Sequence, residues 1–355
     1  MSNKANSKFY PVLENQDELK IPWETLKTII GGTSIIDTKQ LHTSNLKRAL
    51  VFLRAYGINP DNPDDVAASQ TILQVALQYM DEVFLKQGVD EASQFPKELR
   101  ERPIHMLLQD AANWKGTGTN WACLLLKICH ATSHAVWSHD SEAHSKAIEV
   151  ISERLKPHLH TTHGSEWIGD EKCMIPLISF VVKKEKHLFR VITKLLLKSG
   201  NLSTAIRDHV GLRFIVEDTF SAILLIKYMR TRGIFMYANN IPEESKNSLA
   251  GLDEIQSLYE KLGPPDYEDK TRTKNSKKKS SKSSSNQNPY SSAQYGMIKL
   301  IERLLITLPN GRRTFFPYEL QILTRKEWEK LDKGDARHDE YEERQVAAVR
   351  KRLLS

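Results

Sequence analysis

Two acids and a glutamine stand at positions from which β-strands could present them together. In the run 318–323, Tyr-Glu-Leu-Gln-Ile-Leu, a strand period of two places Glu319 and Gln321 on one face and their apolar neighbours on the other. Asp208 comes just before a second apolar run, 211–216. Two carboxylates that meet at such strands could hold Mg²⁺, because this ion binds one or two carboxylates together with substrate phosphates.

Both acids also have a simpler interpretation. An exposed sheet face accepts Glu and Gln freely, and Asp208 by itself suits a helix cap or a loop. The two interpretations differ in one distance. The Mg²⁺ site requires the carboxylates of Asp208 and Glu319 to converge to about 5–6 Å, which one ion could nearly bridge.

Three basic residues lie upstream of these acids. Lys186, Arg190 and Lys194 are spaced four apart, so they share one face of a helix expected over 187–198. No acid on that face of the helix compensates them, and like charges at this spacing repel each other. A phosphate-bearing ligand would make the arrangement favourable, and a solvated basic face is the alternative.

The net charge is concentrated in one tract. Seven Lys or Arg and no acid fall within 270–285, and these seven account for the entire net charge of +7. Such a Lys/Ser tract cannot bury apolar surface, so we expect a disordered basic insertion at about 268–287. It could bind RNA or another polyanion in a salt-dependent way, and a solvated loop fits the same composition.

Periodicity predicts an α+β protein with two domains. Residues 1–175 form a helical domain, with helices over 45–56, 64–87, 121–137 and 141–155. Residues 176–355 form a small mixed-sheet domain flanked by helices. Its expected elements are a helix over 187–198, a strand over 211–216, a helix capped by Asp218 and running to Met229, a strand over 234–237, a helix over 252–262, strands over 295–308 and 313–323, and helices from Arg325.

Histidines gather in the N-terminal half. His130 and His134 lie four apart on an expected helix, and His158, His160 and His163 fall in an expected loop. Metal binding is one interpretation of His130 and His134, but polar helix faces and loops account for all five more simply.

Several classes of protein are excluded by composition. No apolar run reaches the roughly 18 residues of a membrane helix, and the first residues lack the apolar core of a signal peptide. Three cysteines are too few and too irregularly spaced for a disulfide or zinc framework. No P-loop or serine elbow occurs. We expect a cytoplasmic protein that does not bind a membrane.

Four segments together resemble one family. They read Lys184-Glu-Lys186-His187 with Lys194 further along, Asp208-His-Val-Gly211-Leu-Arg213, Glu319-Leu-Gln321-Ile-Leu-Thr324, and His338-Asp-Glu-Tyr341. In order, spacing and expected elements they are similar to the synthetase domain of RelA/SpoT-type alarmone enzymes, over about 183–341. These bacterial enzymes are pyrophosphokinases that transfer diphosphate from ATP to the 3′-hydroxyl of a guanine nucleotide.

The resemblance implies a nucleotidyltransferase-like fold, ATP as the donor substrate and Mg²⁺ as the cofactor. It implies that Asp208 and Glu319 are the catalytic residues and hold the metal, with Glu319 also activating the attacking hydroxyl. The nucleotide-binding residues that it implies are Lys184, Lys186, Lys194, Arg213, Tyr290, Gln321 and His338. Among them, Tyr290 would stack on the acceptor base and Gln321 would orient ligand groups.

The acceptor motif departs from the family pattern. The family sequence Asn-Gly-Tyr-x-Ser-apolar-His is nearest to 288–294, where Pro289 replaces the glycine and Gln294 the histidine. Leu323 stands where the later strand of the family has arginine. The acceptor therefore stays open between GDP or GTP, an adenine nucleotide, and the end of a tRNA or other RNA that the basic tract would contact. The alternative to an enzyme is a non-catalytic nucleotide-sensing or RNA-binding module on the same fold.

Overall fold

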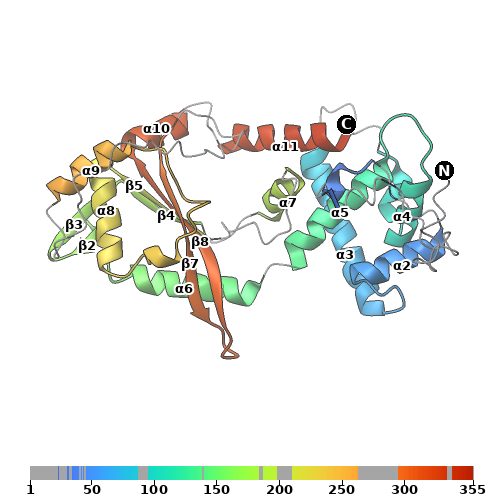
Figure 1. The fold of residues 1–355 in the computed structure, drawn as a ribbon, viewed down its shortest axis with the longest axis horizontal. Coiled ribbons are helices and arrows are strands. Elements are labelled where there is room, and N and C mark those ends of the chain that lie inside the picture. Colours follow the sequence, from blue (N-terminus) through green and yellow to red (C-terminus); the bar gives the residue numbers. More distant parts are fainter. Residues whose placement is uncertain are drawn as a thin grey trace, which may run out of the picture. The chain divides into compact units, whose positions relative to one another are not determined.

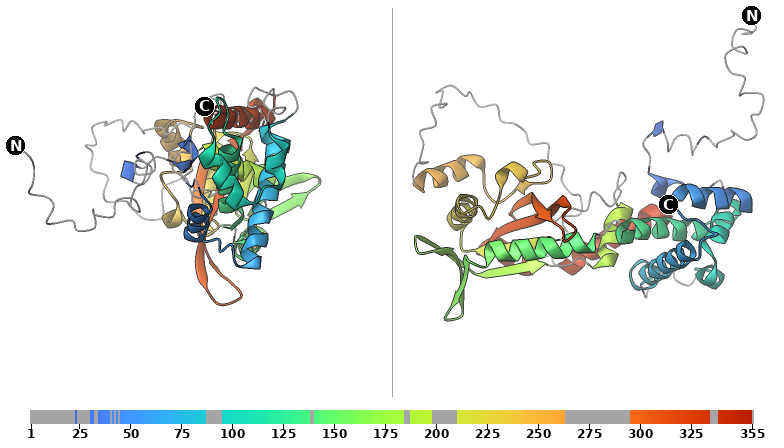
Figure 2. Two further views of the ribbon diagram at one scale, coloured as in Figure 1. Left: turned by 90° about the vertical axis from the view of Figure 1, so that its right-hand side faces the viewer. Right: turned by 90° about the horizontal axis from the view of Figure 1, so that it is seen from below.

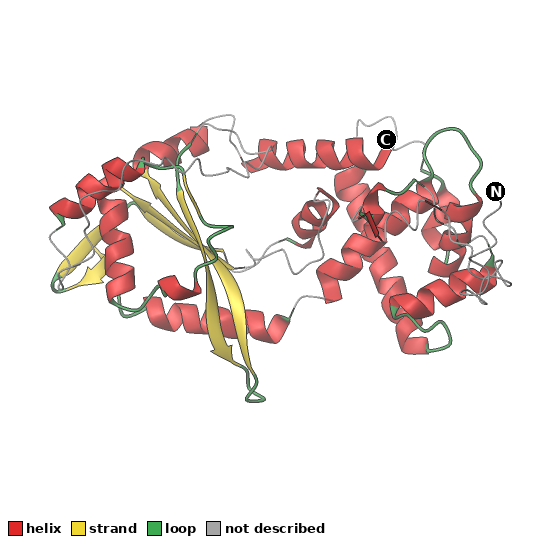
Figure 3. Cartoon of the chain, viewed as in Figure 1, coloured by secondary structure: helices red, strands yellow, loops and turns green. Residues whose placement is uncertain are grey.

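The computed structural model describes residues 23, 30–31, 34–39, 41, 43, 45–86, 95–137, 140–183, 187–197, 210–262, 295–333 and 338–354. Their helices and two β-sheets form an α+β protein, as the sequence predicts (Figure 3). The chain divides into two compact units. The helical unit comprises Met1–His134, Ile192–Leu202 and Ala348–Ser355, and the sheet unit comprises Ala135–Val191 and Ser203–Ala347. The predicted domain border at 175 falls within the sheet unit.

The helical unit is built from helices that the sequence delimits by caps. Its elements are η2 (Ile35–Asp37), α2 (Leu46–Tyr56), α3 (Pro63–Tyr79), the π-helical turn η3 (Met80–Phe84), η5 (Lys97–Glu101), α4 (Ile104–Asn113), most of α5 (Trp121–Trp137), and parts of α7 (Leu188–Leu197) and α11 (His338–Leu354). The Asn45 side chain accepts a hydrogen bond from the Arg48 N–H in the first turn of α2, at 2.9 Å, and Gly57 ends α2 with a φ of +100°. The predicted helices over 45–56 and 121–137 are confirmed.

Polar side chains fasten distant segments of the helical unit together. The Tyr79 and Thr193 hydroxyls lie 3.0 Å apart in its interior, and burial raises the pKa of Tyr79 to about 12. Arg352 donates two hydrogen bonds to Asp37, at 2.6 and 2.8 Å. These contacts join segments that lie more than a hundred positions apart in the sequence.

The sheet unit contains two sheets. After α6 (Ser141–Leu155), an antiparallel three-stranded sheet forms from β1 (Leu159–Thr162), β2 (Ser165–Asp170) and β3 (Cys173–Leu177). A five-stranded sheet contains β4 (Ser179–Lys183), β5 (Val210–Val216), β6 (Lys246–Asn247), β7 (Ile298–Thr307) and β8 (Arg313–Thr324). The remaining elements are α8 (Thr219–Thr231), η7 (Tyr237–Asn239), α9 (Leu252–Lys261), α10 (Arg325–Lys333), the first turn of α7 and most of α11.

The five strands lie in the order β4-β5-β8-β7-β6. The central pair, β5 and β8, is parallel, and all other neighbours are antiparallel. Strands β7 and β8 form a hairpin that is the longest part of the sheet and extends past α6 (Figure 1). Gly311 closes its turn with a φ of +82°, in the Pro-Asn-Gly segment that the sequence marks as a turn.

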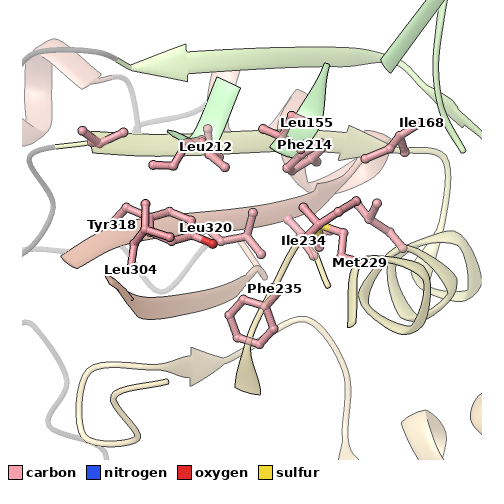
Figure 4. Close-up of a cluster of buried hydrophobic side chains, with 14 of the residues drawn as sticks. Leu155, Ile168, Leu212, Phe214, Met229, Ile234, Phe235, Leu304, Tyr318 and Leu320 are labelled. Carbon is pink, nitrogen blue, oxygen red and sulfur yellow. The ribbon is translucent and has the colours of Figure 1, made fainter. Parts of the chain in front are cut away.

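One face of the five-stranded sheet forms the core of the unit. Alternate residues of the strands, such as Leu212 and Phe214 of β5 and Leu320 of β8, pack against α6, α8 and the three-stranded sheet (Figure 4). Because the side-chain period of a strand is two, the intervening residues must lie on the opposite face.

Glu302 is the charged residue of this core face. Its side chain is 1% exposed, Tyr318 donates a hydrogen bond to its Oε2 at 2.5 Å, and Arg154 lies 3.7 Å from its Oε1. Burial, only partly offset by the hydrogen bonds and by Arg154, raises the pKa of the Glu302 carboxyl.

Two sequence-based expectations in this unit were wrong. Residues 158–163 contain strand β1 rather than only a loop, and the three-stranded sheet that begins there was not anticipated. The strand expected over 234–237 does not form. Gly233, with a φ of +69°, ends α8, and the Ile234 N–H bonds back to the Met229 carbonyl at 2.8 Å, so the apolar run closes a helix instead.

Among the described helices, none combines the length and the apolar character needed to cross a membrane.

Candidate functional site

The face of the five-stranded sheet opposite the core carries polar residues in register. Across β5, β8 and β7, Arg213 pairs with Gln321, and Gln321 pairs with Lys299. One step along the strands, Glu319 pairs with Gly211 on one side and with Ile301 on the other. Cross-strand partners point to the same side of a sheet, so the four polar side chains gather on one face. We call Arg213, Gln321, Glu319 and Lys299 the polar cluster.

The polar cluster is one continuous chain of contacts. Arg213 Nε donates to Gln321 Oε1 at 2.9 Å, and Gln321 Nε2 donates in turn to Glu319 Oε1. Lys299 Nζ lies 2.8 Å from the other carboxylate oxygen, Glu319 Oε2. The glutamine thus orients both the arginine and the glutamate, and the cluster carries two cations and one anion.

The burial of Glu319 makes these contacts energetically significant. Glu319 is only 7% exposed, and the exposed-face alternative therefore does not hold for it. A buried carboxylate needs compensation, which Lys299 and Gln321 supply. Burial also lowers the pKa of Arg213, against the opposing effects of Tyr295 and Glu319.

The backbone that leads into β7, just after Tyr295, is held in place by hydrogen bonds. The Gly296 N–H donates to Glu327 Oε2 at 2.5 Å, and the Met297 N–H donates to Ser248 Oγ at 3.1 Å. A Cβ at Gly296 would lie 2.7 Å from the Ser248 carbonyl oxygen, so only glycine fits this close approach.

The structure brings together three of the residues that the sequence singled out, Arg213, Glu319 and Gln321. Lys194 is half-buried on α7, in the part of that helix that belongs to the helical unit. His338 is the first residue of α11, and its side chain lies outside the described residues. Lys184, Lys186, Asp208 and Tyr290 also lie outside the described residues, as does the Lys/Ser tract. Their roles stay predictions.

An acid from another element pairs with the basic face of α7. Arg190 Nε lies 2.5 Å from Glu342 Oε1 of α11, so the expectation of an uncompensated row of charges was wrong at Arg190. The tertiary contact, and not the helix itself, supplies the compensating charge.

Sequence reasoning missed Lys299 and Tyr295. Lys299 has the same strand parity as Ile301, which faces Glu319, and this signal is available only once the β7–β8 register is known. Lys299 alone would read as an ordinary exposed strand residue.

The polar cluster suits phosphate chemistry. Its two cations can bind phosphate oxygens, and the carboxylate can accept a proton or offer a hard oxygen ligand to a metal ion. Within the described residues, no group of three or more His, Cys, Asp or Glu is arranged to hold a metal. His130 and His134 pack edge to face, and His130 Nδ1 lies 2.9 Å from the Tyr56 hydroxyl.

Comparison with known proteins finds partial likenesses to solved structures. No family model matches the chain. No curated protein matches it. Among solved structures, small alarmone synthetase 1 from Bacillus subtilis is 13% identical with a TM-score of 0.31, over 59% of this chain and 86% of that one. Small alarmone synthetase 2 from Bacillus subtilis is 15% identical with a TM-score of 0.29, over 62% of this chain and 88% of that one. Both are small alarmone synthetases.

Proposed function

We propose that the protein is an ATP-dependent pyrophosphokinase, which transfers diphosphate from ATP to the 3′-hydroxyl of a nucleotide or of an RNA end. One observation carries this proposal. Glu319 is an almost fully buried acid on a β-strand, in contact with Lys299 and Gln321 and one side chain away from Arg213. A sheet that needed only stability would place apolar residues at these positions.

The two cations would hold phosphates. Arg213 is fixed by Gln321, and a guanidinium fixed in this way keeps N–H donors for phosphate oxygens. Lys299 can turn from Glu319 toward a phosphate, because its side chain is a flexible point charge. The predicted Lys184 and Lys186 would add positive charge along the triphosphate.

Glu319 would act as the general base. In the transfer, the acceptor 3′-oxygen bonds to the β-phosphorus of ATP, and the bond between this phosphorus and the α–β bridging oxygen breaks, so that AMP leaves with the electron pair. The hydroxyl proton passes to the Glu319 carboxylate. When Lys299 engages the phosphates, it releases the oxygen of Glu319 that must accept this proton.

A bound Mg²⁺ would spread the charge that develops on the phosphates. The donor chemistry at the polar cluster fits this ion, since Glu319 offers hard carboxylate oxygens. Asp208, as predicted, would supply the second carboxylate.

Tyr295, three residues before β7, interacts electrostatically with Arg213 and would contact the acceptor. An aromatic ring at that position can stack on any nucleobase, so it leaves the acceptor open between GDP, GTP, an adenine nucleotide and an RNA end.

A second candidate is a nucleotide-sensing module without catalysis. The Lys299–Glu319 contact favours it, because a carboxylate that stays paired neither takes a proton nor binds a metal. The two candidates share a ligand and differ in whether the ligand is consumed.

The deciding experiment offers γ-labelled ATP and Mg²⁺ with GDP, GTP, AMP, ADP or deacylated tRNA. The enzyme should move label to at least one acceptor and release one AMP for each label transferred. Glu319→Gln, which keeps the shape and removes the charge, should abolish transfer and retain ATP binding. ATP binding without label transfer to any acceptor would establish the sensing module instead.

A further inference from the structure

The outer end of the β7–β8 hairpin continues the face of the polar cluster. On β7, Arg303 and Leu305 follow Lys299 at strand period two, and on β8, Phe315 and Arg313 precede Glu319 in the same way. The register pairs Leu305 with Phe315 and Thr307 with Arg313. The ten residues of β7 rise by roughly 33 Å, so one face runs from the turn of the hairpin to the polar cluster. We call Arg303, Leu305, Arg313 and Phe315 the hairpin face.

The hairpin face is basic and apolar at once. Residues 303–318 contain three arginines and no acid. Arg303 and Arg313 are exposed, and no acid pairs with either of them in the described part of the chain. Arg312, at the turn, is already paired with Asp140 at the start of α6, 3.0 Å away. The two remaining arginines therefore present positive charge to solvent.

Large apolar side chains stand between these charges. Phe315 is 47% exposed and Leu305 is 37% exposed. The Arg303 guanidinium lies over the Phe315 ring, 5.2 Å from its centroid, so the cation and the ring form one platform before any ligand arrives. The core face of the same strands is packed, with Phe316 beside His144 of α6. The exposure of Phe315 and Leu305 is thus confined to the hairpin face.

The alternation identifies the ligand chemistry. Arginines spaced along an extended hairpin match a phosphate backbone, and an exposed aromatic ring between them matches unpaired bases that stack. An acidic peptide would use the arginines but would gain little from the ring. A nucleic-acid duplex would keep its bases stacked inside and would also not use the ring.

We infer that the hairpin face binds single-stranded nucleic acid, with bases on Phe315 and phosphates on Arg303 and Arg313. The strand runs along the hairpin toward the polar cluster. This surface is distinct from the Lys/Ser tract. The direction of the bound nucleic acid rests on the proposed function and extends it, because the 3′ end of the nucleic acid would then be the acceptor. Binding to the hairpin face does not depend on that function.

Binding is tested with the full chain and a fluorescein-labelled single-stranded 12-mer, as RNA and as DNA, by anisotropy at several salt concentrations. Replacing two arginines, as Arg303→Ala with Arg313→Ala, should weaken binding at least tenfold and reduce the salt slope by about 0.7 for each arginine. Phe315→Leu should weaken binding about tenfold and leave the salt slope unchanged.

The matched control removes two exposed lysines elsewhere in the sheet unit, Lys156→Ala with Lys261→Ala. The control should bind like the unaltered chain, and circular dichroism should show all variants folded. If the control loses as much affinity as the arginine pair, or if a duplex 12-mer binds as tightly as the single strands, the inference is overturned. Tighter binding of the RNA 12-mer than of the DNA 12-mer would identify the ligand as RNA.

Glu319→Gln separates this inference from the proposed function. It should leave the affinity for the 12-mer unchanged and abolish label transfer. If the unaltered chain binds the 12-mer but never transfers label, the pyrophosphokinase is overturned and the hairpin face is not. The opposite result is label transfer to mononucleotides by the unaltered chain, together with an affinity for the 12-mer that Phe315→Leu does not change. This result would overturn the hairpin face alone.

Discussion

Lys299 Nζ lies 2.8 Å from Glu319 Oε2, and this contact joins two neighbouring strands on a face where the glutamate is nearly buried. The register brings the lysine to the glutamate diagonally, since its direct partner is Gln321. Removing either partner of a buried pair leaves the other charge without compensation, whereas removing both leaves none.

Lys299→Met should therefore lower the free energy of unfolding by about 2–3 kcal/mol, because Glu319 keeps its charge and loses its cation. The double variant Lys299→Met with Glu319→Gln should lose less than the sum of the two single variants. Urea unfolding measures all three, with Lys261→Met on the exposed face of α9 as the control, within about 0.5 kcal/mol of the unaltered chain. Strictly additive losses would contradict an interaction between the two side chains.

Gly296→Ala tests how the segment before β7 is positioned. The new Cβ would collide with the Ser248 carbonyl oxygen at 2.7 Å and with Leu249 Cα at 3.0 Å, which are backbone atoms that cannot turn away. We expect the free energy of unfolding to fall by about 1–3 kcal/mol and ATP binding to weaken, because the segment that leads into β7 and its Lys299 must move. Gly251→Ala is the matched control, because nothing lies within 4 Å of its Cβ. Equal stability and ATP affinity in the two variants would show that the close approach has no role.

Glu302 should make the sheet unit less stable as pH rises. Burial raises the pKa of its carboxyl in the folded protein above the value of 4.5 expected when unfolded. The folded state therefore binds the proton more tightly, and the stability that the neutral acid provides is lost as pH rises through the folded pKa. Glu302→Gln is neutral at every pH and still accepts the Tyr318 hydrogen bond through its amide oxygen. Its stability relative to the unaltered chain should increase from pH 4.5 upward, as followed by urea unfolding at several pH values. Parallel curves would show that folding does not change the pKa of the Glu302 carboxyl.

His130 should have the opposite effect in the helical unit. Burial, and secondly His134, lower its pKa from 6.5 to about 4. Between these values the unfolded chain binds the proton and the folded protein does not, so stability is lost as pH falls from 6.5 toward 4. His130→Gln should lose less stability over this range, and NMR should show His130 of the unaltered chain still neutral at pH 5. A charged imidazole at pH 5 would contradict the burial of this ring.

Local signals were enough for most elements of the fold. The bounds of α5 and α6 match the predictions residue by residue, because each has an uninterrupted apolar period and polar boundaries. Strand period two correctly placed Glu319 and Gln321 on one face. The expected strand over 234–237 does not form, because the Ile234 N–H bonds back to the Met229 carbonyl and closes the helix end at Gly233. Short strands such as β1, four residues long, carry too little pattern to be distinguished from a loop.

The polar cluster was only half predictable, for a physical reason. Glu319 and Gln321 stood out by residue type within an apolar run, and Arg213 was singled out by the family resemblance alone, but Lys299 is an unremarkable residue until β7 is paired with β8. Register across a hairpin depends on packing of the whole buried face, which no single segment contains. The same applies to Glu342, which reaches Arg190 from a helix about 150 positions away.

The parallel pairing of β5 and β8 has a consequence for biosynthesis. Arg213 and Gln321 bond to each other although 108 positions separate them. At translation rates of about 5–20 residues per second, the arginine is polymerised roughly 5–20 s before its partner. Throughout that interval the nascent polypeptide has no assembled polar cluster, however many of its helices have already formed, so any ligand must wait for the completed carboxyl-terminal hairpin.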